Sequence, residues 1–242
     1  MKIGTWVKKD GNRGIIRGIN GRKALVRWLG SNRAKYAWLR HLRKSDPPRA
    51  LVLEGSLDNN LASTRSEEDV LRKWLDSNNI QLAYKNVHVL DDIRVIGKSI
   101  GRNRPPFVHI SCHGDLDGFK NLYIKIAPGN RSDNLILLNN EDTIRVFKKA
   151  FGGIPLLFSA CLLGKYKDEI VNFKNEIEVP YIAAFTRTVY DPEAMLFELM
   201  LYHGMLIRGW KFTTAVEKAR DALLMIDVRG AMGHGQAFVR VF

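Results

Sequence analysis

The sequence predicts an α/β protein in which a three-layer domain with a mostly parallel sheet follows a small β-rich module. From residue 50 onward, short apolar runs alternate with segments of helical periodicity, a pattern typical of repeated βα units with right-handed crossovers. Before residue 46, short β-prone pieces are separated by glycine turns. At 242 residues, 45% of them apolar, the chain could form one large domain or one ordinary domain with a small appendage.

Residues 1–45 form the predicted β-rich module. The turns Asp10-Gly11-Asn12 and Asn20-Gly21-Arg22 indicate hairpins, because Asn and Gly tolerate a positive φ. We therefore expect a small five-stranded SH3-like β-barrel. Its large aromatic residues could form a binding surface or the core that such a barrel needs, and for at least two of them we expect the core. These residues are Trp6, Trp28, Tyr36 and Trp38.

The positive charge of the chain is concentrated in this module. Residues 1–45 contain thirteen Lys and Arg and one Asp, a net charge of +12, whereas the other 197 residues contain 25 basic and 24 acidic side chains. Such a module could contact the phosphates of nucleic acid, bind an acidic protein partner or present a solvated face. No motif typical of RNA or DNA reading accompanies the charge, so nucleic acid stays an open, less favoured partner of residues 1–45.

Cysteine content and the chain start point to a cytoplasmic protein. Two cysteines argue against a disulfide-stapled secreted scaffold and fit a reducing cytosol. The first residues have no apolar signal region, and no run approaches membrane-spanning length, so we expect no membrane partner. A metal site is not expected either, because Cys112 and Cys161 lie far apart and the adjacent Cys112 and His113 diverge across a strand.

Asp46-Pro47-Pro48-Arg49 has the composition of a linker, so residues 46–49 are expected to connect the module to a domain over residues 50–242. Expected strands cover residues 50–54, 81–89, 107–113, 156–161, 179–185 and 236–242, and residues 121–126 are expected to form a loop or small ribbon over the sheet edge. Two helices are expected over residues 91–100 and 167–175. Four more are expected to start at N-terminal capping signals, which lie at Thr64, Asn140, Asp191 and Thr214.

Two of these strands stop on residues capable of nucleophilic or acid–base chemistry. One ends in Cys112-His113-Gly114 and the other in Ser159-Ala160-Cys161. Because ligands gather outside the carboxyl ends of parallel strands, the two tips would face one crevice if the strands are neighbours. There the Cys161 thiolate would attack a carbonyl and His113 would manage the proton. The backbone N–H groups of Gly114 and Cys161 are candidates for stabilising the oxyanion.

Structural roles compete with these functional ones. A lone Cys or His in an α/β core is usually structural. Here both residues stand at the ends of expected strands, which favours catalysis. Cys112 neighbours His113 and so faces the opposite side of the sheet, where core packing is expected. His109 shares the His113 side two residues deeper, where a hydrogen-bonded core histidine is expected.

Several motifs occur in a fixed order after residue 50. They are His113-Gly114, Ser159-Ala160-Cys161, the run 179–184 before Asp191, and the tail 212–220. In order, spacing and strand context they resemble the caspase-like cysteine peptidases, specifically the CHAT family related to separase. The 48 residues from His113 to Cys161 are close to the roughly 50 of caspases. The resemblance covers about residues 50–242.

This resemblance implies a caspase-like sandwich with a mostly parallel six-stranded sheet. It also implies a cysteine endopeptidase with a His113 and Cys161 dyad and no cofactor. Its substrate would be a protein partner, often within prokaryotic antiviral defence or cell-death pathways.

The chain departs from caspases beside the nucleophile, where Gln-Ala-Cys-Arg-Gly is replaced by the residues 159–163, Ser-Ala-Cys-Leu-Leu. A preference for Asp before the scissile bond is therefore not expected. An acidic S1 pocket favouring Arg or Lys could come from Asp115, Asp117 or Asp191, although Asp191 also suits a helix N-cap. Arg187 could instead favour an acidic residue. Ser159 is a further candidate for contact with the substrate.

Two functions follow from these features. The first is an active endopeptidase whose N-terminal module docks a regulatory protein partner or regulates access to the site. The second is a catalytically silent caspase-like adaptor whose basic barrel binds nucleic acid or an acidic protein. The presence of both dyad residues favours the first.

Overall fold

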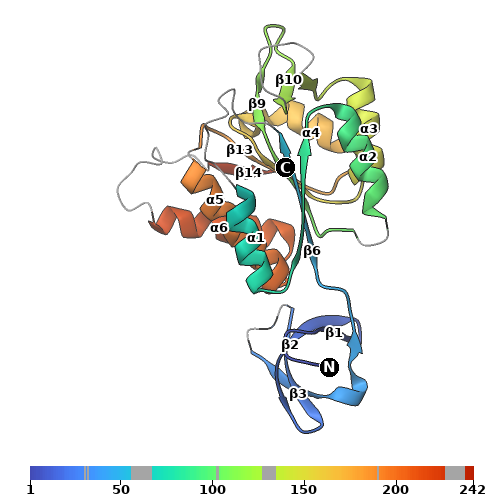
Figure 1. Ribbon diagram of the computed structural model, residues 1–242. Helices are drawn as coiled ribbons and strands as arrows, with labels where there is room; N and C mark the ends of the chain where they lie inside the picture. The colour runs from blue at the N-terminus through green and yellow to red at the C-terminus, as the bar shows by residue number, and fades with distance from the viewer. Residues whose placement is uncertain are drawn as a thin grey trace.

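The computed structural model describes residues 1–29, 31, 33–55, 67–101, 104–126, 135–189, 191–226 and 238–242. These residues form three sheets of five, six and three strands (Figure 1). No helix in the described part of the chain is long and apolar enough to span a membrane.

The first sheet is antiparallel, in the order β4-β3-β2-β1-β5. Its strands are β1 (Trp6–Lys9), β2 (Asn12–Asn20), β3 (Lys23–Trp28), β4 (Lys35–Trp38) and β5 (Arg43–Lys44), with a 3-10 turn η1 (Leu39–His41). Its own small core consists of Val7, Ile16, Ala24, Val26, Ala37 and Leu42. Five short strands match the expected number, and their identity as an SH3-like barrel stays a prediction.

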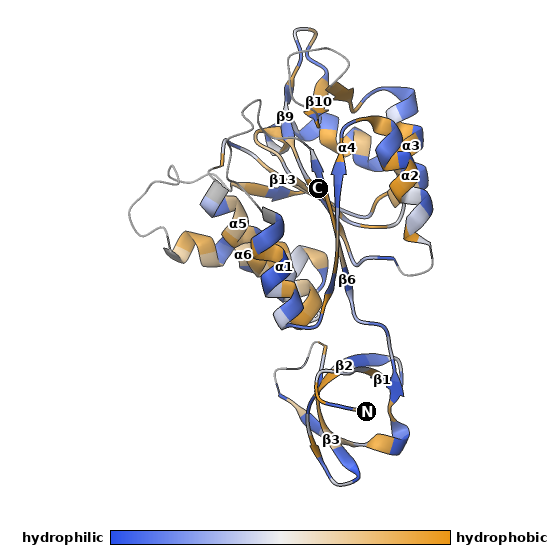
Figure 2. Ribbon diagram, viewed as in Figure 1, coloured by the Kyte–Doolittle hydropathy of each residue, from blue (hydrophilic) through white to orange (hydrophobic). Residues whose placement is uncertain are grey.

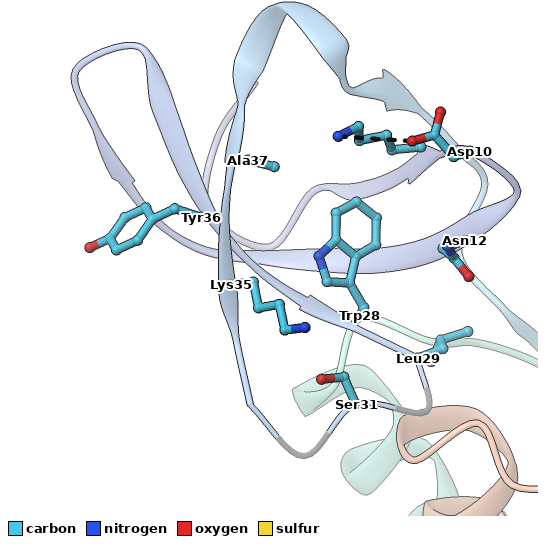
Figure 3. A pocket seen from close by; sticks show the side chains of 9 residues that line it. Asp10, Asn12, Trp28, Leu29, Ser31, Lys35, Tyr36 and Ala37 are labelled. Carbon is cyan, nitrogen blue, oxygen red and sulfur yellow. Dashed lines mark ion pairs between the residues drawn. The ribbon is translucent and has the colours of Figure 1, made fainter.

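A pocket of about 470 Å³ opens in this N-terminal sheet (Figure 3). Trp28 and Lys35 line it together with the ion pair of Lys9 and Asp10. Trp28 also packs against the small core of the sheet.

Trp6 and Ile15 attach the N-terminal sheet to the rest of the molecule. Both are buried in a hydrophobic cluster that includes Ile80, directly before β7, and the indole Nε1 of Trp6 donates to the backbone oxygen of Asn79 at 2.7 Å. Trp28 thus packs against the core of its own sheet as expected, but Trp6 is buried in the cluster shared with the rest of the molecule and Tyr36 and Trp38 are exposed, so the expectation of at least two rings in the barrel's own core is wrong. Figure 1 shows the N-terminal sheet beyond the end of the central sheet at which β6 begins.

The second sheet is the central layer, in the order β14-β13-β12-β8-β6-β7. Five strands are parallel and β14 runs antiparallel to β13, which confirms the predicted mostly parallel six-stranded sheet. Its strands are β6 (Arg49–Gly55), β7 (Gln81–Val87), β8 (Val108–Ser111), β12 (Leu156–Ser159), β13 (Ile182–Phe185) and β14 (Val239–Val241).

Helices cover both faces of this sheet (Figure 1). Buried residues of α2 (Leu90–Ile100), α3 (Glu141–Phe151) and α4 (Lys167–Glu176) share one hydrophobic cluster with the sheet, and those of α1 (Glu67–Ser77), α5 (Asp191–Tyr202) and α6 (Phe212–Ile226) share the other. The helices carry both apolar and polar residues along their length, as helices between a sheet and solvent do (Figure 2). The predicted three-layer α/β arrangement is thus confirmed.

The small third sheet differs from the expected strand layout. The chain leaves the central sheet after β8 and starts β9 (His113–Leu116), which pairs with β10 (Leu122–Lys125), and β10 pairs with β11 (Leu135–Leu137). The expected small ribbon at residues 121–126 is therefore one strand of a three-stranded sheet.

The described residues test two of the four predicted capping signals. Asn140 caps α3 as predicted, since its side chain accepts hydrogen bonds from the backbone amides of Asp142 and Thr143. Helix α6 begins at Phe212, two residues before the predicted Thr214. The predicted cap at Thr64 and the side chain of Asp191 lie outside the described residues.

Candidate active site

The strands that lead to His113 and Cys161 are neighbours in the central sheet. β8 pairs with β12 in parallel, with Ser111 opposite Ser159, and the amide of Cys112 donates to the backbone oxygen of Ser159 at 3.2 Å. Every pair in this register differs by 48 residues, the separation of His113 and Cys161. Each of these two residues therefore stands two positions beyond one member of the same serine pair.

Burial along the two strands separates the two faces of the sheet. Val108, Ile110 and Cys112 belong to the cluster on the α2, α3 and α4 side. His109 faces the other side, where it contacts Tyr202 of α5. Leu157, the partner of His109, packs in the α1, α5 and α6 cluster. The alternation ends with the strands at Ser111 and Ser159, before His113 and Cys161.

A tight backbone turn follows Cys161. Leu162 has a φ of 67°, in the left-handed region that a bulky residue rarely adopts. Its amide donates to the backbone oxygen of Arg187 at 3.4 Å, and the amide of Leu163 donates to that of Cys161 at 2.8 Å. Such strain is held only where the surroundings enforce it, and it clusters at functional sites. Cys161 is half-buried at this turn, and His113 is exposed.

Gly114 packs directly against the turn that follows Cys161. A Cβ built on Gly114 would lie 2.5 Å from Cγ of Leu163, which begins the 3-10 turn η3 (Leu163–Lys165) after Cys161. No other residue type fits at position 114 without moving the Leu163 side chain. The glycine therefore brings β9 against the turn that carries the cysteine.

The two cysteines differ in environment. Cys112 is 3% exposed, as expected for a core residue, and burial raises the pKa of its thiol, with a smaller contribution from the nearby Cys161. Cys112 therefore stays a neutral thiol at physiological pH. The more exposed Cys161 is the better candidate for a nucleophile.

Asp115 lies two residues beyond His113 on β9. It pairs across the sheet with Tyr123, and its Oδ1 accepts a hydrogen bond from the Tyr166 hydroxyl at 3.5 Å. Burial and then the Asp115 charge raise the pKa of both tyrosines, so their hydroxyls stay protonated. This arrangement can present a negative charge and two hydroxyl groups beside the strand ends.

Asp117 and Arg187, two other candidates for the S1 pocket, make contacts of their own. The carboxylate of Asp117 accepts hydrogen bonds from the amides of Phe119 and Asn121 and from the Asn121 side chain, which gives it a structural role in the turn between β9 and β10. Arg187 lies beside the cysteine turn, but its guanidinium is 3.5 Å from the Glu193 carboxylate and stacks over Phe238.

A buried polar network lies beneath the strand ends. The Ser159 hydroxyl donates to Oε1 of Glu198 at 2.6 Å, and the same oxygen is 3.4 Å from Nε2 of His109. Nδ1 of His109 lies 3.2 Å from the Tyr202 hydroxyl. His109 and Glu198 are fully buried, so the expected hydrogen-bonded core histidine is confirmed, and Ser159 points into this network instead of toward solvent.

The sequence reasoning missed Glu198 and Tyr202. A signal was present, because Glu198 is a single acidic residue within the apolar run 194–201 of α5. A charged residue in such a run is buried with a partner or lines a site. In the described residues, no three His, Cys, Asp or Glu side chains gather closely enough to hold a metal ion.

Comparisons with known proteins identify the fold alone. No family model matches the chain, and no curated protein matches it. Among solved structures, the X-ray structure of a secreted C11 cysteine protease from Bacteroides thetaiotaomicron, in complex with an irreversible peptide inhibitor, matches with a TM-score of 0.53 and 10% sequence identity. The match covers 80% of this chain and 65% of that chain, so this chain spans less than two thirds of its neighbour. The chain therefore shares the fold of this cysteine protease.

Proposed function

We propose that the chain is a cysteine endopeptidase in which His113 and Cys161 form the catalytic dyad. The observation that carries the proposal is the register of β8 and β12, which have Ser111 opposite Ser159, each two positions before a dyad residue. The fold shared with a cysteine protease is consistent with this chemistry.

In the proposed reaction, the Cys161 thiol gives its proton to His113 and its sulfur attacks the carbonyl carbon of the scissile peptide bond. The backbone N–H groups of Gly114 and Cys161 donate to the developing oxyanion. The C–N bond then breaks as His113 protonates the leaving amine. Water hydrolyses the resulting thioester, with His113 accepting a proton from it, and the free thiol is regenerated.

The proposed substrate is a protein with a basic residue before the scissile bond. Asp115 supports this choice, because it shares its side of β9 with His113 and lies against two tyrosines. Arg187 would favour an acidic residue instead, but Glu193 partly neutralises its charge. Cleavage of a peptide library by the wild-type chain distinguishes the basic from the acidic preference, with Cys161→Ala as the control that should not cleave.

The sequence resemblance supports the finer parts of the proposal. They are membership of the CHAT family, a peptidase domain over residues 50–242, a linker over 46–49 and an SH3-like module over 1–45. A cytoplasmic role in prokaryotic antiviral defence or cell death belongs to the same proposal. The adaptor alternative keeps the fold but predicts no turnover.

Reaction with iodoacetamide near neutral pH tests the dyad directly. We expect selective labelling of Cys161 that is lost in His113→Ala, because the imidazole favours the thiolate. Cys112 is a control within the same chain, since its raised pKa keeps it a thiol. Equal labelling of both cysteines, or labelling of Cys161 that is unaffected by His113→Ala, would refute the dyad.

A further inference from the structure

The N-terminal sheet has an outer surface on β3 and β4 that its own core does not use. We call it the aromatic–basic face and define it by Lys23, Leu25, Tyr36, Trp38 and Arg40. Tyr36 is 61% exposed and Trp38 is 43% exposed. Tyr36 is among the residues that line the pocket of Figure 3, and its ring points away from Trp28 and Lys35 there. These two aromatic rings therefore remain accessible to a ligand.

The strand register places the two rings next to each other. Tyr36 and Trp38 are two residues apart on β4 and so share one side of the strand, about 7 Å apart along it. Across the sheet, Leu25 pairs with Tyr36 and Lys23 pairs with Trp38. Gly18, the next partner of Leu25, has no side chain to cover this part of the face. The face thus has two flat rings over a low, open surface.

Two cations flank the Trp38 ring. Nζ of Lys23 lies 4.8 Å from the Trp38 ring centroid, and Cζ of Arg40 lies 5.5 Å from it. Asp10 is the single acidic residue among residues 1–45, whose net charge is +12. The side chains of Lys23 and Arg40 are long and exposed, so they can move from the Trp38 ring to a nearby phosphate.

We propose that the aromatic–basic face binds single-stranded nucleic acid. Tyr36 and Trp38 stack on unpaired bases, and Lys23 and Arg40 contact the phosphates on either side. Exposed aromatic rings within a basic surface are the features that single-strand binding requires. A duplex keeps its bases stacked on one another, and an acidic peptide needs the charge but not the flat rings. Both features together therefore favour a single strand.

Fluorescence anisotropy with the full-length Cys161→Ala chain and a labelled oligothymidylate tests the proposal. This variant removes the proposed nucleophile, so the assay does not depend on peptidase activity. Tyr36→Ala with Trp38→Ala should weaken binding at least about ten-fold, because each stacked base contributes strongly to affinity. Phe119→Ala, which removes a ring that is 88% exposed on the turn between β9 and β10, should leave binding unchanged.

The charge contribution is measured from the salt dependence. Lys23→Ala with Arg40→Ala should lower the slope of log affinity against log salt by about 1.4, since each single-strand phosphate contact contributes about 0.7. Lys98→Ala with Lys149→Ala, an exposed pair on α2 and α3, is the charge-matched control and should bind as the parent chain does.

Three results would overturn the proposal. The first is no binding of the oligonucleotide at low salt, and the second is equal loss of single-strand and duplex binding when the two rings are removed. The third is tighter binding of polyglutamate than of the oligonucleotide with the same dependence on Tyr36 and Trp38. This last result would assign the face to an acidic protein.

Discussion

Replacing Glu198 by alanine tests the buried network beneath the strand ends. In the wild-type chain, one carboxylate oxygen accepts the Ser159 hydroxyl at 2.6 Å and lies 3.4 Å from Nε2 of His109. Glu198 and His109 are fully buried, and Ser159 is 8% exposed. Glu198→Ala removes the group that connects α5 to β8 and β12, and no solvent is available to replace it.

The structure sets the expected size of the effect. Glu198→Ala takes the acceptor away from the buried Ser159 hydroxyl, which costs about 1–3 kcal/mol, and opens a cavity, so we expect a total loss of about 3–5 kcal/mol. Glu198→Gln keeps the volume and an acceptor for Ser159, so it should lose less, about 1–2 kcal/mol, through the changed contact with His109. Glu217→Ala on the exposed side of α6 should change stability by less than about 0.5 kcal/mol.

Urea unfolding followed by far-UV circular dichroism measures these free energies. A double-mutant cycle with Ser159→Ala isolates the hydroxyl–carboxylate contact, and we expect a coupling of about 1.5–3 kcal/mol. A loss below about 1 kcal/mol for Glu198→Ala, or equal losses for the alanine and glutamine variants, would contradict the reasoning. In that case the network would not be what holds α5 to the strands.

Three further changes test other parts of the structure. Trp6→Ala removes a side chain that is 4% exposed and its bond to Asn79, so it should destabilise the attachment of the N-terminal sheet by about 3–5 kcal/mol, measured as faster proteolysis of residues 46–49. Gly97→Ala would put a Cβ 2.4 Å from that of Ala150 and force α2 from α3, which we expect to lower the melting temperature through a loss of about 1–3 kcal/mol. Hydrogen bonds within its turn hold the pKa of Asp117 below its usual range, so the stability it gives the turn is present above about pH 4 and is lost as the pH falls through its own lower pKa. The protection of the turn amides from hydrogen exchange, relative to an unfolded chain at the same pH, should fall in acid in the wild type and stay constant in Asp117→Asn. Unchanged proteolysis, melting or exchange would refute the respective prediction.

Much of the central sheet was predictable because its strands are short apolar runs bounded by turn residues. The run 156–161 and the run 107–113 each end in a reactive residue, and that local pattern located both strands before their pairing was known. Their adjacency was harder to predict, since the order of strands in a sheet depends on contacts between distant segments. The equal separation of 48 residues in the ladder makes Ser111 and Ser159, the last residues of the two strands, level with each other.

The break between β8 and β9 illustrates what the sequence could not predict. Residues 107–113 are continuously β-prone, and no turn residue stands at Cys112, where the chain leaves the central sheet. The break arises from tertiary packing, because β9 pairs with β10 and Gly114 fits against Leu163. Residue type alone also could not rank Asp115 above Asp117, since the turn hydrogen bonds of Asp117 appear only in the folded chain.

The position of the N-terminal sheet limits how it could influence the proposed dyad. Trp6 and Ile15 pack beside Ile80, where β7 begins, whereas His113 and Cys161 follow the carboxyl ends of β8 and β12. The seven residues of β6 run parallel to these strands and span about 23 Å. A partner on the aromatic–basic face therefore lies beyond the opposite end of the sheet and does not cover the dyad. Such a partner would act by raising the local concentration of a substrate tethered to it. A tethered substrate reaches the dyad more often than one free in solution.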